Sequence, residues 1–151
     1  APLITESEIF RKAVLQERPI RVTLELGLKA NIALVGIGAA HPEIYNPFRL
    51  GYISKDELNE ISGNGAVGLI CGRHYSIDGT ELDIQVNRKV IGITLKELEE
   101  VEWVIGVAGG ALKAESILGA LRGRHVNVLV TDDIAARKAL EIHKAGGSRA
   151  V

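Results

Sequence analysis

The sequence predicts an α/β fold in which a mostly parallel sheet is flanked by helices. Residues 103–142 alternate between strand and helix patterns with short joins, which is typical of parallel strands linked by right-handed crossovers. Residues 31–37 form a short continuous apolar run, which indicates a strand buried on both faces. Glycines, 17 of the 151 residues, fall at many of the joins.

The first thirty residues predict one helix and leave the next segment undecided. Thr5-Glu6-Ser7-Glu8 has the capping-box pattern, and the apolar residues that follow it have helical spacing. Pro19 either ends this helix or begins the next one. Residues 20–29 fit a strand by their alternation and a helix by their four-residue spacing.

The middle of the chain predicts a helix, then strands, then a short acidic helix. Capping boxes mark the start of both helices, and a turn of the hairpin type separates two strand patterns. In order, we predict a helix from Ser54-Lys55-Asp56-Glu57 to about Ile61, a stop at Gly63-Asn64-Gly65, one strand over 67–75, a turn at Asp78-Gly79, a strand pattern in Leu82, Ile84 and Val86, and a helix opened by Thr94-Leu95-Lys96-Glu97.

The last fifty residues give the clearest pattern. Strands are predicted over 103–107 and 126–130, and a flexible tail over 146–151. Between and after the strands we predict a tight turn at Ala108-Gly109-Gly110, a helix over 112–122 with Leu112, Ser116, Ile117, Ala120 and Leu121 along one side, and a final helix capped by Thr131-Asp132-Asp133 with Ile134, Ala135, Ala139 and Ile142 as its apolar side.

Length and composition exclude several classes of protein. A chain of 151 residues with 46% hydrophobic and 25% charged residues suits a single globular domain rather than a disordered segment. The net charge of −1 gives no overall electrostatic attraction for nucleic acid. The single cysteine excludes an internal disulfide and favours a reducing compartment, and no apolar run reaches the roughly 18 residues of a membrane span. The absence of Met predicts that the chain is a piece of a longer product or is numbered from the middle of one.

Three predicted strand ends could hold a ligand: Gly36-Ile37-Gly38, Ala108-Gly109-Gly110 and Thr131-Asp132. The second is the most suggestive, because its glycines permit close approach and the following helix offers free N–H groups to an anion. Lys113, in the first turn of that helix, would pair with such an anion. The alternative is that the glycines only make a turn and Lys113 points into solvent.

The other polar residues favour structural roles, and the sequence predicts neither a cofactor nor a metal. Gly36-Ile37-Gly38 lacks the third glycine and the following helix of a dinucleotide fingerprint. Thr131-Asp132 is most simply a helix cap. Cys71 is more often a small core residue than a nucleophile, although neighbouring Arg73 and His74 leave a reactive thiol open. Four scattered histidines have no metal-ligand spacing: His41, His74, His125 and His143.

Five segments, in the right order across nearly the whole chain, resemble the sugar-binding (effector-binding) domain of the SorC family of bacterial transcription regulators. They are Ile32-Ala33-Leu34-Val35-Gly36-Ile37-Gly38, Gly51-Tyr52-Ile53-Ser54, Gly65-Ala66-Val67-Gly68, Ile105-Gly106-Val107-Ala108-Gly109-Gly110 with Lys113-Ala114-Glu115, and Val126-Asn127-Val128-Leu129-Val130-Thr131-Asp132, with Ala1-Pro2 similar to the family's Pro-Ala-Pro segment.

The resemblance implies a Rossmann-like fold related to the sugar-phosphate isomerases, with a phosphorylated sugar or related metabolite as ligand. It implies a cytoplasmic dimer or tetramer that binds DNA through an N-terminal helix-turn-helix, which this chain lacks. Residues 1–145 would be the later part of the effector domain, incomplete at its N-terminal side. The expected ligand-binding residues are Lys113, Gly109, Gly110, Ala108, Gly38, Ala39, Arg49 and Leu69.

Leu69 departs from the family pattern. The family usually has an acidic residue directly after Gly-Ala-Val-Gly, where it bonds ligand hydroxyls, and a leucine cannot accept those bonds. Either the ligand differs, or another polar group such as Arg73 or Arg49 serves, or binding has been lost. Two other functions therefore stay open: an isomerase-type enzyme with Asp132 or Asp78 as its base, and a structural or oligomerising remnant.

Overall fold

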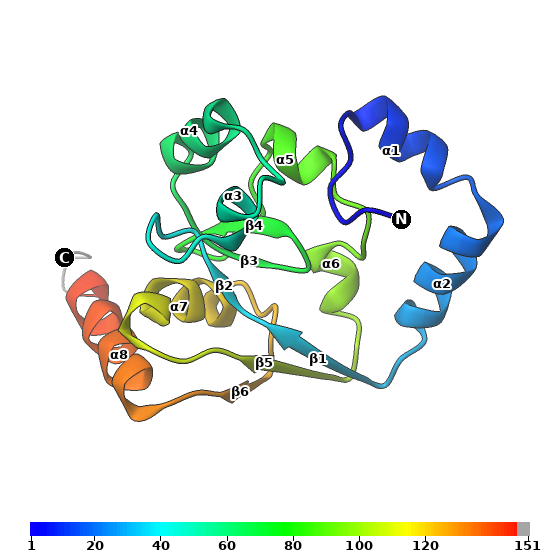
Figure 1. Ribbon diagram of the computed structural model, residues 1–151. Coiled ribbons are helices and arrows are strands. Elements are labelled where there is room, and N and C mark those ends of the chain that lie inside the picture. Colours follow the sequence, from blue (N-terminus) through cyan, green and yellow to red (C-terminus); the bar gives the residue numbers. More distant parts are fainter. Residues whose placement is uncertain (148–151) are drawn as a thin grey trace.

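The computed structural model describes residues 1–147 and has a mixed α/β fold with two small sheets (Figure 1). The α/β class with a parallel sheet and flanking helices is confirmed, and a second, antiparallel sheet is added to it. The parallel sheet has the order β1 (Ile32–Gly36), β5 (Trp103–Val107), β6 (Val128–Val130), and the antiparallel sheet has the order β2 (Gly38–Ala39), β3 (Ala66–Ile70), β4 (Arg73–Ser76).

Helix α7 lies between the two sheets, with α8 beside it, whereas α1 and α2 lie at the opposite end of the molecule (Figure 1). The helices are α1 (Glu8–Val14), α2 (Arg18–Leu28), α3 (Asn46–Arg49), α4 (Lys55–Gly63), α5 (Gln85–Arg88), α6 (Leu95–Leu98), the 3-10 helix η1 (Ala111–Lys113), α7 (Ala114–Arg122) and α8 (Asp133–Gly147).

Most helix starts lie where the sequence predicts them. The capping boxes at Ser54 and Thr94 are confirmed, with the hydroxyl and the glutamate carboxylate each accepting a backbone N–H. Asp132 caps α8 by accepting the N–H of Ala135 at 2.7 Å. The undecided residues 20–29 belong to α2, which begins at Arg18 with Pro19 in its first turn, where a missing N–H costs nothing.

The first capping box is wrong by two residues. Ser7, not Thr5, caps α1, and its hydroxyl accepts the N–H of Phe10. The Thr5 hydroxyl instead donates to the carbonyls of Ser7 and Lys89, and so joins the N-terminal segment to the segment after α5. The Thr5 hydroxyl, which the local pattern predicted to cap α1, therefore bonds to Lys89, a residue distant in the sequence.

The single strand predicted over 67–75 is two strands of a hairpin. Cys71 and Gly72 both have positive φ, at 52° and 81°, and turn the chain between β3 and β4. Glycine adopts this conformation without strain. Because the turn intervenes, Cys71 and Arg73 do not share a strand face.

Three further expectations are corrected. Leu82, Ile84 and Val86 form no strand: the segment bends into α5 and buries Ile84 and Val86 in a second core. Of the five residues predicted along one side of the helix over 112–122, Ser116, Ile117 and Ala120 are buried, whereas Leu112 and Leu121 are exposed. The predicted tail begins too early, since residues 146 and 147 continue α8; residues 148–151 lie outside the described residues.

Small residues let α7 approach the antiparallel sheet closely. A side chain on Gly68 would lie 2.5 Å from the Ser116 side chain, and one on Gly119 would lie 2.8 Å from the Ser76 carbonyl. The Tyr75 hydroxyl then donates to the Ser116 carbonyl at 2.9 Å. Gly68, the second glycine of Gly65-Ala66-Val67-Gly68, is therefore required for α7 to pack against β3.

A second core cluster lies under the loop that follows β2. Tyr45 is buried in it, and its hydroxyl lies 2.6 Å from His74 Nε2. His74 Nδ1 lies 3.0 Å from Asn87 Oδ1, and both residues are buried. Burial lowers the pKa of His74 to about 4, so the ring is neutral near pH 7.

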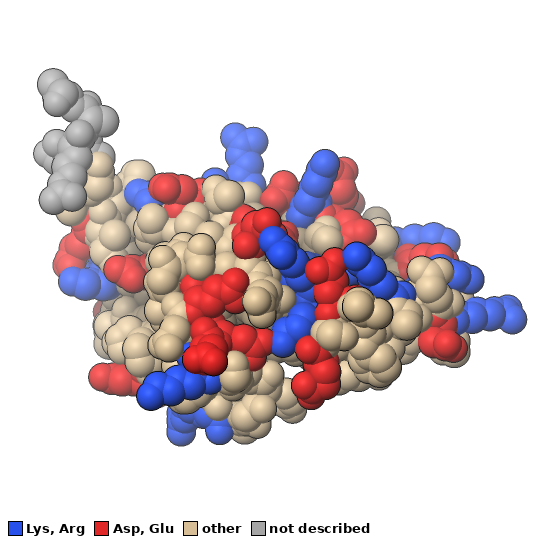
Figure 2. Space-filling model, turned by 90° about the horizontal axis from the view of Figure 1, so that it is seen from above, with Lys and Arg blue, Asp and Glu red and all other residues tan. Residues whose placement is uncertain are grey.

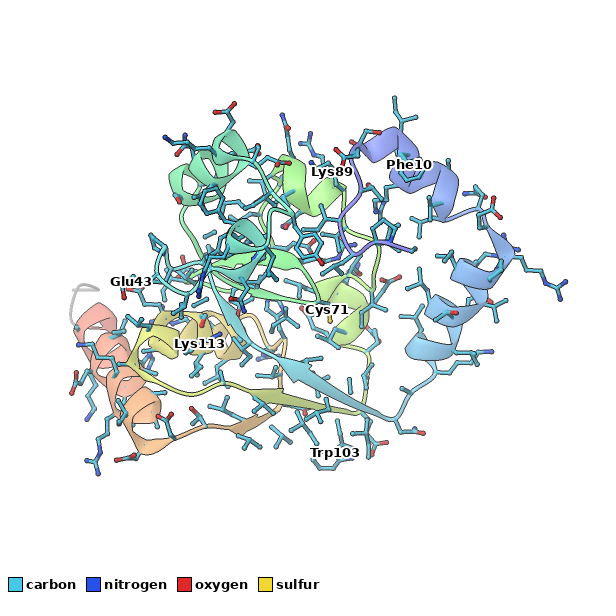
Figure 3. All side chains as sticks on the ribbon, viewed as in Figure 1. Phe10, Glu43, Cys71, Lys89, Trp103 and Lys113 are labelled. Carbon is cyan, nitrogen blue, oxygen red and sulfur yellow. The ribbon has the colours of Figure 1, made fainter. Side chains whose placement is uncertain are left out.

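One face of the parallel sheet is apolar, and no helix among residues 1–147 covers it. The residues of this face lie opposite each other in the sheet register: Ile32 beside Trp103, Leu34 beside Ile105, and Val107 beside Val130. All of them are exposed except Ile105, which is half-buried. Trp103 projects from the side of the sheet opposite to α7 (Figure 3). The expectation that 31–37 is buried on both faces is therefore wrong for this chain, in which helices cover the other face alone. We call these residues the open face.

A leucine on the open face should contribute far less to the stability of this 151-residue chain than a leucine in the main core. Leu34→Ala should change the free energy of unfolding by less than about 0.5 kcal/mol, because Leu34 is 73% exposed. Leu98→Ala should lower it by about 2–5 kcal/mol, because Leu98 is fully buried in the main core. Urea unfolding followed by circular dichroism measures both. A loss for Leu34→Ala equal to that for Leu98→Ala would mean that this face is covered in solution.

His74 predicts a loss of stability in acid. Its folded pKa of about 4 lies below its ordinary value of 6.5, so the unfolded chain binds the proton more readily, and stability falls as the pH drops through this window. The contribution is at most about 1.4 kcal/mol per pH unit. The side-chain NMR signals of His74 in the folded protein should stay in the neutral position from about pH 7 to about pH 5. Titration of those signals near the ordinary value would contradict the burial argument.

Candidate functional site

Two adjoining hollows lie where β1 ends and η1 begins, and Ile44, Asn46 and Lys113 line both of them. We call them the inner hollow, of about 240 Å³, and the outer hollow, of about 520 Å³, and together the cleft. The inner hollow is also lined by Gly36, Gly38, Ala39, Pro47, Leu69, Cys71 and Gly72, and the outer hollow by Arg49, Gly109, Gly110, Ala111 and Leu112.

Lys113 is the charged group at the centre of the cleft. Its ammonium donates a hydrogen bond to the carbonyl of Ile37 at 2.8 Å, so the side chain crosses from η1 to the junction of β1 and β2 (Figure 3). Partial burial lowers its pKa. Within residues 1–147 no carboxylate lies within ion-pair distance of this ammonium. The ammonium is thus partly removed from water and paired only with a neutral acceptor.

The Gly109-Gly110 turn is held by Asp132 from the end of β6. One carboxylate oxygen accepts the N–H of Gly110 at 2.6 Å, while the other caps α8. Gly110 has a φ of 89°, and a side chain on Gly109 would lie 2.6 Å from the Asp132 carboxylate. The glycines therefore serve the turn, and the Gly110 N–H already has a partner.

Leu69 forms an apolar wall beside Gly38. The two residues are paired across β2 and β3, and a side chain on Gly38 would lie 2.5 Å from the Leu69 Cδ2. The leucine thus fills the space that the glycine leaves. The Leu69 side chain offers no hydrogen-bond acceptor to a ligand, and Asn46 is the amide side chain that lines both hollows.

Every predicted site residue except Ala108 lines the cleft. Ala108 is buried, and its N–H donates to the Val130 carbonyl, so it supports the turn from beneath. The prediction missed the wall formed by Ile44, Asn46 and Pro47. The loop rich in proline and asparagine was visible in the sequence, but the fold alone places it over the strand ends.

Two alternatives for the missing acidic residue can now be compared. Arg73 is buried, and it donates to the carbonyls of Ile93, Asn87 and Gly92 and to the Glu81 carboxylate, so it cannot reach the cleft. Arg49 is exposed and lines the outer hollow. Arg49 is therefore the second cation that can face a ligand there.

The two candidate bases, the histidines and the cysteine that the sequence singled out can now be placed. Both carboxylate oxygens of Asp132 accept backbone N–H groups, and Asp78 lines neither hollow. Within residues 1–147 no group of three or more His, Cys, Asp and Glu side chains is arranged around a common metal position. Burial raises the pKa of the Cys71 thiol.

Acidic and basic side chains are interspersed over the face seen from above (Figure 2). This face shows no broad basic area, in keeping with the net charge of −1. No helix in the described part of the chain is both long and apolar enough to span a bilayer.

Comparison with known proteins gives one consistent result. Residues 1–141 match a family model described as "putative sugar-binding domain". The chain is 37% identical over 136 residues to the deoxyribonucleoside regulator of Bacillus subtilis, and the match covers 90% of this chain and 43% of that protein. The chain thus spans less than half of that regulator's length.

Two solved structures share the fold. A DeoR family transcriptional regulator from Listeria monocytogenes superposes with a TM-score of 0.86 at 28% identity, covering 92% of this chain and 56% of that one. The full-length sorbitol operon regulator from Klebsiella pneumoniae gives 0.81 at 30% identity, covering 90% and 44%. These matches confirm the resemblance, and the chain belongs to the sugar-binding domain family of SorC-type and DeoR-type transcriptional regulators.

Proposed function

We propose that this chain is the ligand-sensing part of a bacterial transcription regulator and that its cleft binds a phosphorylated sugar or a related small anion. The observation that carries the proposal is the half-buried Lys113 ammonium, which faces a cleft without a carboxylate in its described lining. An anion bound beside Lys113 would offset the cost of keeping that charge partly out of water.

The lining of the cleft suggests a division of roles. Lys113 would pair with the phosphate, and Arg49 would approach it from the outer hollow. Gly110, beside which a side chain would meet no atom within 4 Å, would let the ligand come close to the backbone. Leu69, Ile44 and Pro47 would cover the apolar part of the ligand. Leu69 in place of an acidic residue favours a ligand with fewer hydroxyl groups at that position.

A sensor fits the geometry better than an isomerase does. An isomerase needs a base close to the substrate carbon, and the described lining of the cleft has no carboxylate. The relatives with assigned roles are regulators. We propose that the full-length protein is a cytoplasmic homo-oligomer that binds DNA through a helix-turn-helix outside this chain. The full-length protein would exist in a state that binds DNA and a state that does not. The ligand would shift the equilibrium between them by at most the ratio of its affinities for the two states.

We also propose that residues 1–145 are the later part of a larger effector domain. The open face supports this, because parallel sheets are ordinarily covered on both faces. The match covers 56% of the Listeria monocytogenes chain. A protein of that length would have ample further polypeptide to cover the open face.

The role of Lys113 predicts a defined thermal response of the full-length protein. One compound among glucose 6-phosphate, ribose 5-phosphate and fructose 1,6-bisphosphate should raise the unfolding midpoint, by an amount equivalent to about 2.7 kcal/mol at about 100 times its Kd. Lys113→Ala should abolish the rise, because the ammonium contacts the phosphate. Lys12→Ala, an exposed lysine on α1, should respond like wild type.

A rise that Lys113→Ala retains would place the anion contact elsewhere. No response to any of the three compounds would favour the structural remnant, with Leu69 marking the loss of binding. Turnover of one of them would revive the isomerase.

The larger effector domain predicts a change at Trp103, the one tryptophan of the 151 residues. In this chain alone its fluorescence should be quenched readily by acrylamide, because the side chain lies on the open face. In the full-length protein the emission should shift to the blue and resist quenching. Equal quenching in the two proteins would show that the remaining polypeptide leaves this face uncovered.

A further inference from the structure

One segment forms a wall of both hollows, and a single side chain fixes it to the body of the protein. Among residues 41–50, only Tyr45 is classed as buried. Its neighbours Ile44 and Asn46 line both hollows, and Arg49 lines the outer one. The position of the cleft wall therefore depends on where Tyr45 is held.

The hydroxyl of Tyr45 ends a buried hydrogen-bond chain whose direction can be assigned. The Asn87 amide nitrogen donates to the carbonyls of His74 and Leu82, at 2.9 and 2.8 Å, so its oxygen faces His74. That oxygen accepts the backbone N–H of His74 at 2.8 Å and the ring Nδ1–H at 3.0 Å. His74 Nε2 is then the acceptor, and the Tyr45 hydroxyl donates to it at 2.6 Å.

The rest of the segment is held mainly by bonds to itself. The backbone N–H groups of Ile44, Leu50 and Tyr52 donate to the backbone carbonyls of His41, Asn46 and Pro47. These bonds join the loop, α3 and the residues directly after α3 to one another. The last contact with the sheet before this segment is the N–H of Ala40 on the Val67 carbonyl. A wall attached in this way would lose order when its buried attachment is weakened.

We propose that Tyr45, His74 and Asn87 are positioning residues of the cleft: they hold residues 41–50 in the ligand-binding arrangement without lining either hollow. This inference rests on the proposed function, because the effect it describes is on ligand affinity. When the hydrogen-bond chain is intact, the wall is ordered before the ligand arrives. When it is broken, binding must order the wall, and the apparent affinity falls by the fraction of molecules that are competent.

The test compares Tyr45→Phe with Ile61→Val in the full-length protein. Tyr45→Phe removes only the hydroxyl, and Ile61→Val perturbs the same buried cluster without touching the hydrogen-bond chain. Calorimetry with ribose 5-phosphate and with inorganic phosphate, at a temperature where all variants are folded, measures Kd. We expect about tenfold weaker binding for Tyr45→Phe and a change below about twofold for Ile61→Val. Hydrogen exchange should accelerate in residues 43–50 of Tyr45→Phe alone.

The two readouts separate this inference from the proposed function. If wild type binds and Tyr45→Phe binds equally well with unchanged exchange, the positioning role is overturned and the sensor function stands. If Ile61→Val weakens binding as much as Tyr45→Phe, a general loss of packing explains the effect and the inference also fails. If wild type binds neither probe and also fails to bind glucose 6-phosphate and fructose 1,6-bisphosphate, the proposed function fails. Unchanged exchange in residues 43–50 of Tyr45→Phe would overturn the attachment as well.

Discussion

Ile37 is the point on which the rest of the structure depends, because the two sheets meet there. Its N–H donates to Val107, which continues the parallel pairing of β1 with β5, and the next residue, Gly38, pairs with Leu69 in the antiparallel sheet. Its buried side chain packs over Gly106, where a side chain would lie 2.9 Å from it. Its carbonyl accepts the Lys113 ammonium. A single buried residue thus ends one sheet, leads into the other and holds the cation of the cleft.

The close packing of α7 explains why Lys113 can reach that carbonyl. Gly68 and Gly119 let the helix lie against the antiparallel sheet with almost no space between them. The Ser116 hydroxyl donates to the Lys113 carbonyl at 2.8 Å and so connects η1 to the first turn of α7. Asp132 holds the preceding glycine turn from the other side. The cleft is therefore built from rigid strand ends on one side and from the loop attached by Tyr45 on the other.

The sequence predicted the parts of this site that depend on local chemistry. The glycine turn and the Asp132 cap each follow from the preference of a residue type for a backbone position, and Lys113 stands three residues after the turn, where a cation suits a bound anion. The contacts between Leu69 and Gly38 and between Tyr45 and His74 could not be predicted, since they join segments that are brought together only by folding. The Cys71-Gly72 turn was missed because a Cys-Gly pair is not one of the usual hairpin-turn signals such as Asn-Gly or Asp-Gly. Residues 82–86 alternate as a strand does, yet their alternation buries Ile84 and Val86 in the second core before α5. Residues 31–37 are apolar on both faces, although helices cover only one face in this chain.

The central claim is that a phosphorylated ligand binds between the strand ends, beside Lys113. NMR of the full-length protein with isotopically labelled lysine and glycine tests it directly during titration with the sugar phosphate that gives the largest thermal response. The account predicts that the Lys113 ammonium signal and the amide signals of Gly38 and Gly109 shift together along one binding curve, while those of Gly27 and Lys12 stay in place. Saturable shifts that leave Lys113 and these cleft glycines unmoved would contradict it.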